Sequence, residues 1–386
     1  MTQSPGTPRL LRRLNDRAAL ELLLSDGPLT RAELGERTGL SKVTAGQLLA
    51  RLEERGLVQV AGERAGGRGP NAALYGVVAA SAYVAGLEVL PDSITVAVAD
   101  ITGKIVVEIT VNPADGKDPV KTVHNAVQRA CASANIHQSQ LRAFVIGTRG
   151  VVDPRTGDVR FSYDLPSWHV GVLASLRATL GASVTIENDV NLVALAEHFY
   201  GAAVGQDDFV VIWAGVGQGL GVMLGGRLHR GITGGAGEIG WLPVPGEPLP
   251  ADVSQPQSGS FQRLVGHDAL AGLAASFGVT GRTVPDQVRT AAAIGAVGFL
   301  DAVAERLAVG VAAVAVVLDP GLIVLSGDIG RAGGRQLADR VEAAVARFCP
   351  SQPSVVTTGV SGNPVLRGAL VAALEQAREQ VFSDTV

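Results

Sequence analysis

The stretch SVTIENDVNLVALAEH, residues 183–198, decides the fold of this chain. Residues 184–186 are apolar or β-branched, which is typical of the end of a buried strand. Apolar residues between Leu192 and Ala196 predict a helix over residues 191–198. Glu187-Asn188-Asp189 lies between strand and helix, at the carboxyl end of the strand, where ligands bind in α/β folds.

Asn188 and Asp189 have two interpretations, and the tripeptide alone leaves both open. An amide beside a carboxylate can hold a polyol, because Asp accepts hydroxyl protons and Asn both donates and accepts hydrogen bonds. Asn and Asp are also preferred residues for capping the first turn of a helix. The rest of the chain has to decide between a ligand site and a cap.

Composition indicates an ordinary globular protein. With 386 residues, 47% hydrophobic and 18% charged, the chain is long enough for two or three domains. Cys131 and Cys349 lie far apart without a partner motif, which argues against a disulfide framework and a zinc site of the usual spacing. The first residues do not predict a signal peptide, and the most apolar run, residues 307–318, is too short to span a bilayer as a helix. We therefore expect a cytoplasmic location and no membrane contact.

The charge of the chain is distributed unevenly. Residues 1–75 carry 11 Lys and Arg against 8 Asp and Glu, whereas the whole chain carries 32 against 36. A small basic end on an acidic body suggests that this end meets a polyanion.

The first eighty residues have the pattern of a helix-turn-helix. Apolar residues at helical spacing predict a helix over residues 10–24; they are Leu10, Leu11, Leu14, Ala18, Leu22 and Leu23. Thr30 with Glu33 forms a capping-box spacing before a short helix over residues 31–38, and Ser41 caps a third helix over residues 42–55. The expected inner positions of this third helix are Val43, Ala45, Leu48, Leu49 and Leu52. A helix in this position enters the major groove of DNA with its N-terminus first.

Two short strands follow and predict a wing. Residues 57–60 and 73–77 are strand-like, and the loop between them, residues 61–71, is rich in Gly and Arg. The whole stretch resembles the winged helix-turn-helix of bacterial repressors; the alternative is a helical docking domain with a solvated Arg loop. We expect Ser41, Lys42, Thr44 and Gln47 at the DNA-facing end of the third helix. Phosphate or minor-groove contacts are expected from Arg31, Arg51, Arg64 and Arg68.

The remainder of the chain alternates strands and helices. Three strand-like runs over residues 83–111 precede a helix over residues 118–135 and a buried strand over residues 144–147. This α/β order resembles the first lobe of the actin-like, sugar-kinase (ribonuclease H-like) fold. We expect a winged helix-turn-helix over residues 1–78, one lobe over 79–187 and a second over 188–371. The C-terminal helix, residues 372–386, is expected to return to the first lobe.

Several runs together resemble the ROK family, which holds bacterial sugar kinases and sugar-responsive repressors. The repressors carry an added N-terminal winged helix, as this chain does. No single run is specific, but their order and spacing are; they are residues 98–103, 150–153, 164–168, 187–189, 226–228, 234–240 and 319–327.

The resemblance implies that kinase chemistry has been lost. Kinases hold ATP phosphates on backbone amides in glycine-rich loops. Here the first such loop corresponds to residues 88–92, from Glu88 to Asp92, which contain no glycine and a proline that removes an amide donor. Val216 stands where the family's kinases have Thr, and Ser326-Gly327-Asp328 replaces a run of glycines. Asp189 matches the catalytic base, but a base without a held phosphate donor transfers no phosphoryl group.

The same resemblance implies that the sugar site is largely kept. Residues matching the family's sugar-binding positions are Asp164, Asn188, Asp189, Glu238, Trp241 and Gln262. Trp241 replaces a His that ligates zinc together with three cysteines in the family. Residues 242–259 contain no cysteine, so we expect neither zinc nor another cofactor.

The sequence thus predicts a DNA-binding transcription regulator, most simply a repressor, that senses a sugar or sugar phosphate in an inactive kinase fold. Binding to a palindromic double-stranded operator implies a homodimer or homotetramer. Two alternatives remain: an active sugar kinase with an appended DNA-binding domain, and a regulator with a non-sugar effector or none.

Overall fold

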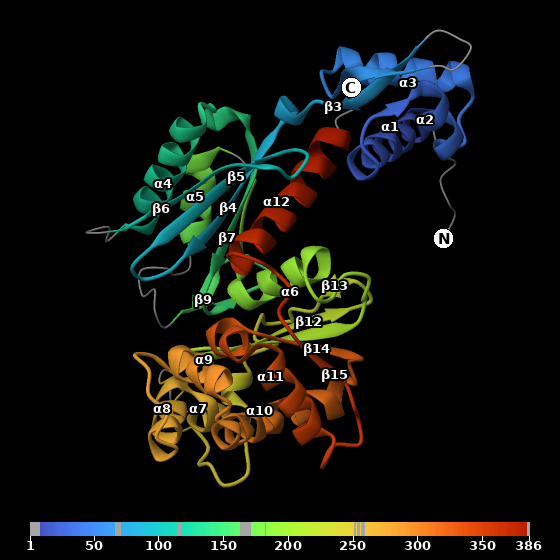
Figure 1. The fold of residues 1–386 in the computed structure, drawn as a ribbon. Coiled ribbons are helices and arrows are strands. Elements are labelled where there is room, and N and C mark those ends of the chain that lie inside the picture. The colour runs from blue at the N-terminus through green and yellow to red at the C-terminus, as the bar shows by residue number, and fades with distance from the viewer. Residues whose placement is uncertain are drawn as a thin grey trace.

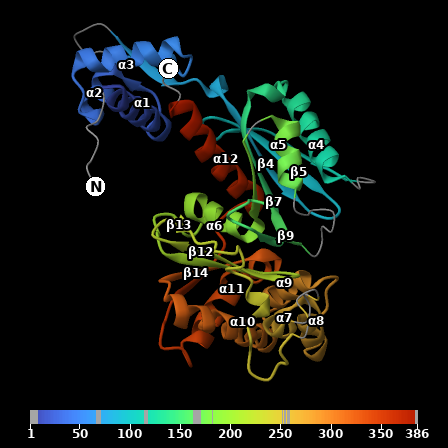
Figure 2. The same ribbon diagram turned by 180° about the vertical axis from the view of Figure 1, so that it is seen from behind.

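The chain folds into an N-terminal domain and two lobes (Figure 1). The computed structural model describes residues 8–65, 71–113, 118–162, 171–181, 183–250, 252, 255 and 259–383. Both views place the N-terminal domain at one end of the molecule, beside the first lobe, with the second lobe at the other end (Figure 2).

The N-terminal domain is a winged helix-turn-helix, as expected. Its elements are α1 (Pro8–Ser25), β1 (Leu29–Thr30), α2 (Arg31–Thr38), α3 (Lys42–Glu54), β2 (Val58–Arg64) and β3 (Ala72–Val77). Thr30 and Glu33 form the predicted capping box, and the Ser41 side chain accepts a hydrogen bond from the Thr44 amide. β2 continues to Arg64, so the hairpin strands extend further than the predicted 57–60.

Two details of the predicted helix faces are wrong. Leu10, Leu11 and Leu14 are exposed, whereas Leu23, which was also predicted to be apolar-facing, is buried together with Leu20. Val43 was expected inside but is 70% exposed. It lies in the first turn of α3, outside the stripe made by Ala45, Leu48, Leu49 and Leu52.

The first lobe contains a five-stranded sheet in the order β10-β7-β4-β5-β6. Strands β4, β5 and β6 form an antiparallel meander, and β7 and β10 add in parallel. The elements are β4 (Tyr83–Val89), β5 (Ile94–Asp100), β6 (Ile105–Val111), α4 (Pro119–Ala134), β7 (Leu141–Thr148), β8 (Val151–Val152), β9 (Val159–Phe161), α5 (Val172–Leu180) and β10 (Ser183–Asn188). Helices α4 and α5 cover one face of this sheet with a single buried cluster.

The second lobe repeats the sheet plan, with strand order β13-β12-β11-β14-β15. Its strands are β11 (Phe209–Ala214), β12 (Gln218–Leu224), β13 (Arg227–Leu228), β14 (Leu322–Ser326) and β15 (Ser354–Thr357). The helices on its outer face are α7 (Ser260–Val265), α8 (His267–Ser276), α9 (Val284–Ile294), α10 (Val297–Leu318) and α11 (Gly327–Val345). Two sheets of this kind confirm the predicted sugar-kinase fold class.

Two helices, α6 (Asp189–Tyr200) and α12 (Pro364–Ser383), lie between the sheets and contact each other closely. A Cβ atom on Gly368 of α12 would come within 1.8 Å of the Leu192 carbonyl oxygen in α6, so only glycine permits this approach. Helix α12 begins at Pro364, eight residues before the predicted start at residue 372, and packs against β4 and β7 of the first lobe. Its buried residues share one core with the first lobe and the N-terminal domain.

None of the described helices is long and apolar enough to cross a membrane. Cys131 and Cys349 are both buried and unpaired. Within the described ranges, no three His, Cys, Asp or Glu side chains lie close enough together to hold a metal ion.

Candidate functional site

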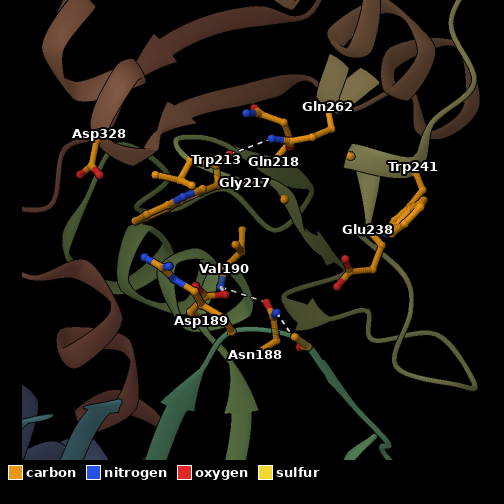
Figure 3. A pocket seen from close by; sticks show the side chains of 15 residues that line it. Asn188, Asp189, Val190, Trp213, Gly217, Gln218, Glu238, Trp241, Gln262 and Asp328 are labelled. Atoms are coloured by element: carbon orange, nitrogen blue, oxygen red, sulfur yellow. Dashed lines mark hydrogen bonds between the residues drawn. The ribbon is translucent and has the colours of Figure 1, made fainter. Parts of the chain in front are cut away.

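A cleft opens at the carboxyl ends of strands from both sheets (Figure 3). The strands β7, β10 and β11 end at it, and the first turns of α6 and α11 reach it. The lining residues are Arg149, Gly150, Asn188, Asp189, Val190, Trp213, Val216, Gly217, Gln218, Gly219, Glu238, Gly240, Trp241, Gln262 and Asp328. Five of the six expected effector-binding residues therefore come together here. The sixth, Asp164, lies outside the described residues.

Asn188 is both a helix cap and a cleft residue, so the two interpretations of its position combine. Its Oδ1 accepts hydrogen bonds from the amides of Val190 (2.9 Å) and Asn191 (3.1 Å), which caps α6. Its Nδ2 donates to the Gly150 carbonyl at 3.0 Å. These bonds fix the side chain and tie the start of α6 to the end of the first-lobe sheet.

Asp189 is the first residue of α6, and one carboxylate oxygen accepts the Val190 amide at 2.9 Å. Burial raises the pKa of Asp189 to about 7, and the positive charge of Arg149 opposes that rise. Glu88 and Glu238 raise the pKa further, because their charges disfavour a third carboxylate nearby. Asp189 is thus poised between its neutral and ionised forms near pH 7, as a general base would be.

The other side of the cleft is built by the second lobe. Glu238 directly precedes a short 3₁₀ helix, Ile239–Trp241, and burial raises its pKa. Gln262 lies in α7, where its Nε2 donates to the Val216 carbonyl at 2.8 Å. Glu238 and Trp241 lie together on one side of the cleft, with Gln262 above the centre in this view (Figure 3).

An ion pair that we did not predict braces the site: the Glu187 side chain is 8% exposed, and its partner Arg230 is 43% exposed. Glu187 accepts hydrogen bonds from Arg230 Nε at 2.6 Å and from Asn191 Nδ2 at 2.9 Å. Arg230 belongs to the second lobe, so the pair joins that lobe to the end of β10. The sequence shows an acidic residue, Glu187, beside Asn188, but no sequence motif identifies Arg230 as its partner.

The side of the cleft that would face a phosphate donor differs from a phosphate-binding loop. After Glu88 the chain forms a tight turn closed by the Leu90 amide bonding to the Ser93 carbonyl at 2.9 Å. Burial also raises the pKa of Glu88, which accepts a hydrogen bond from Asn363. This segment therefore presents a buried carboxyl group, where a phosphate would need amide donors.

Residues 215–221 around Val216 correspond to the second phosphate loop of the family's kinases, and packing largely explains their glycines. A Cβ on Gly219 would come within 2.7 Å of Val190 Cγ2, and one on Gly221 within 2.8 Å of the Val190 carbonyl oxygen. Both glycines thus let β12 lie directly against α6. Only Gly217 has open space beside it.

The sequence reasoning missed Arg149, Trp213, Gln218 and Asp328 as cleft residues. Arg149 follows a buried apolar strand, and a charge in that position is a usable signal. In the sequence, Trp213 is an ordinary strand residue. Whether its side chain faces the cleft depends on how β11 pairs with its neighbouring strands.

The exposed face of α3 carries the expected base-reading residues. Lys42, Thr44 and Gln47 are all exposed, and Ser41 starts the helix beside them. Arg31 is exposed at the start of α2, and its side chain lies alongside Gly46 of α3.

Two of the expected phosphate contacts are instead engaged within the domain. Arg51 donates to Asp16 at 2.7 Å, and the Asp16 side chain is 0% exposed, so this ion pair joins α3 to α1. Arg64 pairs with Glu33 of α2, because β2 is longer than expected and brings it there. Arg68 lies outside the described residues.

Together these features define a class: a winged helix-turn-helix joined to a two-lobed sugar-kinase fold. The ROK family model matches residues 84–376, and a MarR family model matches residues 14–69. The chain belongs to the ROK family.

Two curated relatives agree with this placement. The chain is 25% identical over 248 residues to the DNA-binding transcriptional dual regulator NagC of Escherichia coli (strain K12), covering 63% of this chain and 60% of that protein. It is 26% identical over 244 residues to the xylose repressor of Bacillus subtilis (strain 168), covering 61% of each. The matches thus span about three fifths of these relatives' length.

The crystal structure of a ROK family transcriptional regulator, a homologue of the E. coli MLC protein, has the same fold over the whole length. Its TM-score is 0.76 at 18% identity, and the match covers 97% of this chain and 100% of that one.

Proposed function

We propose that this protein is a DNA-binding transcription regulator, acting as a repressor, whose kinase-fold cleft senses a sugar or sugar-derived effector. One observation carries the proposal: the cleft keeps Asn188, Asp189 and Glu238 together, while the segment from Glu88 to Asp92 offers no phosphate loop. Hydroxyl groups fit such acceptors. The names of NagC and the xylose repressor, both regulators, agree with this reading.

The DNA-binding half of the proposal rests on α3. Its exposed N-terminal face carries Lys42, Thr44 and Gln47, the geometry with which a recognition helix reads base edges in the major groove. A palindromic operator needs two such helices about 34 Å apart, so the functional unit is a homodimer or a dimer of dimers. Such a protein acts where the chromosome lies, in the cytoplasm.

Selection of bound duplexes from random DNA with the purified full-length chain tests this half. We expect an inverted repeat to emerge, and Gln47→Ala to alter the selected bases. Arg31→Ala should instead weaken all sequences alike and reduce the salt slope by about one unit. Arg335→Ala, on the far surface of the second lobe, is the matched control. Failure to retard any duplex at low ionic strength contradicts the proposal.

The sensing half is tested by adding sugars to the retarded complex and by calorimetry on the free protein. The effector should release the operator because it favours one lobe arrangement. An active kinase is the rival function. Turnover with ATP, magnesium and a sugar, lost in Asp189→Asn, would establish that rival.

A further inference from the structure

The cleft extends beyond the residues that match a sugar site. Trp213 at the end of β11, Gln218 at the start of β12 and Asp328 in the first turn of α11 line its remaining part. In the close view, Trp213 and Asp328 lie on one side, while Glu238 and Trp241 lie on the other (Figure 3). Each side thus pairs an indole ring with a carboxylate.

Gln218 offers a buried acceptor that is unsatisfied among the described residues. The side chain is 7% exposed, and its Nε2 donates to the carbonyls of Gly215 (3.1 Å) and Val265 (3.4 Å). Those two carbonyls fix the amide orientation, because a flipped amide would set oxygen against oxygen. Gln218 Oε1 is then buried and has no hydrogen-bond partner among the described residues. An unsatisfied buried acceptor costs about 1–3 kcal/mol, and this cost lies in the wall of the cleft that Gln218 lines.

Trp213 has room in the cleft because its neighbour is glycine. A Cβ on Gly215 would come within 2.8 Å of the indole Nε1. Indole faces pack well against the apolar C–H faces of sugar rings, as aromatic rings do against apolar surfaces generally. Trp213 therefore provides a second flat platform, distinct from Trp241.

Asp328 makes this part of the cleft unsuitable for a phosphate. The N-terminus of α11 would favour an anion, but Asp328 already places a negative charge in its first turn. With Asp189 and Glu238 also lining the cleft, three carboxyl groups face one cationic side chain, Arg149, among the described lining residues. A phosphate would be repelled here, whereas neutral hydroxyl donors would be accepted.

We propose that Trp213, Gln218 and Asp328 form a second saccharide subsite, so that the effector is an unphosphorylated disaccharide or longer oligosaccharide. One ring occupies the subsite of Asn188, Asp189 and Glu238, and the next lies where a kinase would place its phosphate donor. This inference rests on the proposed sugar-sensing function and adds the size and charge of the effector.

Isothermal titration calorimetry on the full-length chain tests the second subsite. The probes are glucose, xylose and N-acetylglucosamine, each compared with its disaccharides: cellobiose and maltose, xylobiose, and N,N′-diacetylchitobiose. We expect at least one disaccharide to bind at least tenfold more tightly than its monosaccharide. Trp213→Ala and Asp328→Ala should each remove most of that gain and change the monosaccharide Kd less than twofold.

Variants on the two sides of the cleft separate the subsites. Glu238→Gln should weaken the monosaccharide and the disaccharide alike, whereas Asp339→Asn, on the outer surface further along α11, should change neither. Thermal unfolding of each variant, followed by circular dichroism, establishes that it folds.

Each other outcome overturns the inference in a distinguishable way. Monosaccharides that bind as tightly as every disaccharide would remove the second subsite but leave sugar sensing intact. The second subsite is also ruled out, with sugar sensing intact, if Trp213→Ala and Asp328→Ala weaken monosaccharide and disaccharide binding equally. It is likewise ruled out if ATP with magnesium binds and competes with the disaccharide. If no probe binds at all, both the subsite and the proposed sugar effector fall.

Discussion

Neighbouring residues at the head of α6 have different tasks. The oxygen of Asn188 is used by two backbone amides, so this residue mainly fixes the start of the helix. Asp189 directs its carboxyl group to the cleft, where burial and neighbouring carboxylates raise its pKa to about 7. The carboxyl group of Asp189 therefore lies on a rigid helix end, which fixes its position in the cleft.

Ionisation of Asp189 should lower the free energy of unfolding at high pH. Its pKa is about 7 in the folded protein and about 4 in an unfolded chain, so between these values only the folded state keeps the proton. The contribution of Asp189 to the free energy of unfolding is therefore complete below about pH 4 and is lost as the pH rises toward 7. We expect Asp189→Asn to raise the melting temperature at pH 8 but much less at pH 5. An equal rise at both values, or a similar pattern for the exposed Asp339→Asn, would contradict this explanation.

Val43 should read a methyl group in the operator. It is 70% exposed in the first turn of α3, between Lys42 and Thr44, where the helix meets base edges. An apolar side chain there suits the C5-methyl of thymine. We expect Val43→Ala to lose about 1 kcal/mol of discrimination at one base pair. Replacing that thymine by uracil should weaken the parent protein and leave Val43→Ala unaffected, as measured by gel retardation.

At the scale of elements, close contacts between helices set the limits of substitution. Helices α6 and α12 meet where Gly368 approaches the Leu192 carbonyl oxygen. We expect Gly368→Ala to destabilise the protein by about 3 kcal/mol, because a backbone carbonyl cannot rotate away from the added methyl group. Gly272→Ala in α8 has open space beside it and should stabilise by about 0.5–1 kcal/mol. Chemical denaturation measures both, and equal effects would refute the packing argument.

The pair of Arg51 and Asp16 joins α3 to α1. Removing Arg51 leaves an Asp16 carboxylate that is 0% exposed without its partner, which costs about 3–5 kcal/mol. We expect Arg51→Ala to lower the melting temperature of the protein, while the salt slope of DNA binding by the folded variant stays unchanged. Arg37→Ala breaks a more exposed pair with Asp26 and should cost less than about 1 kcal/mol. A reduced salt slope for Arg51→Ala would restore it as a phosphate contact.

For the whole molecule, α12 is a direct connection between the cleft and the DNA-binding domain. Asn363, just before the helix, donates to Glu88 near the cleft. At the other end, Arg55 of the N-terminal domain donates to the Val381 carbonyl at 2.8 Å. The two figures of the fold show this helix running from between the lobes to the winged domain (Figures 1 and 2).

Weakening the far end of α12 should uncouple sensing from DNA binding. We expect Arg55→Ala to reduce the effect of sugar on operator affinity severalfold, since allosteric couplings are typically about 1–3 kcal/mol. The sugar affinity measured by calorimetry in the absence of DNA should change little. The neighbouring, exposed Glu54→Ala is the control. Undiminished release of the operator by sugar in Arg55→Ala would show that another contact carries the coupling.

The fold could be predicted from the sequence because the sequence signals for it are local. The Thr30–Glu33 capping box, the Ser41 cap and the strand-turn-strand runs after Tyr83 depend on neighbours in the chain, and the structure agrees with them. The errors concern which side of a helix is buried, and not whether the helix exists. Val43 and Leu10, Leu11 and Leu14 of α1 fit an apolar helical period, but tertiary packing leaves these side chains exposed.

Local signals were sufficient to predict the order of the elements, the family, and the residues at the head of α6, because caps, turns and apolar periods act over a few residues. Three-dimensional packing was needed to show that Arg51 braces α1, that Gly219 and Gly221 let β12 lie against α6, and that Trp213, Gln218 and Asp328 share the cleft. These residues are far apart along the chain. Strand register and the packing of one layer on another bring them together, and neither is encoded in a short stretch of sequence.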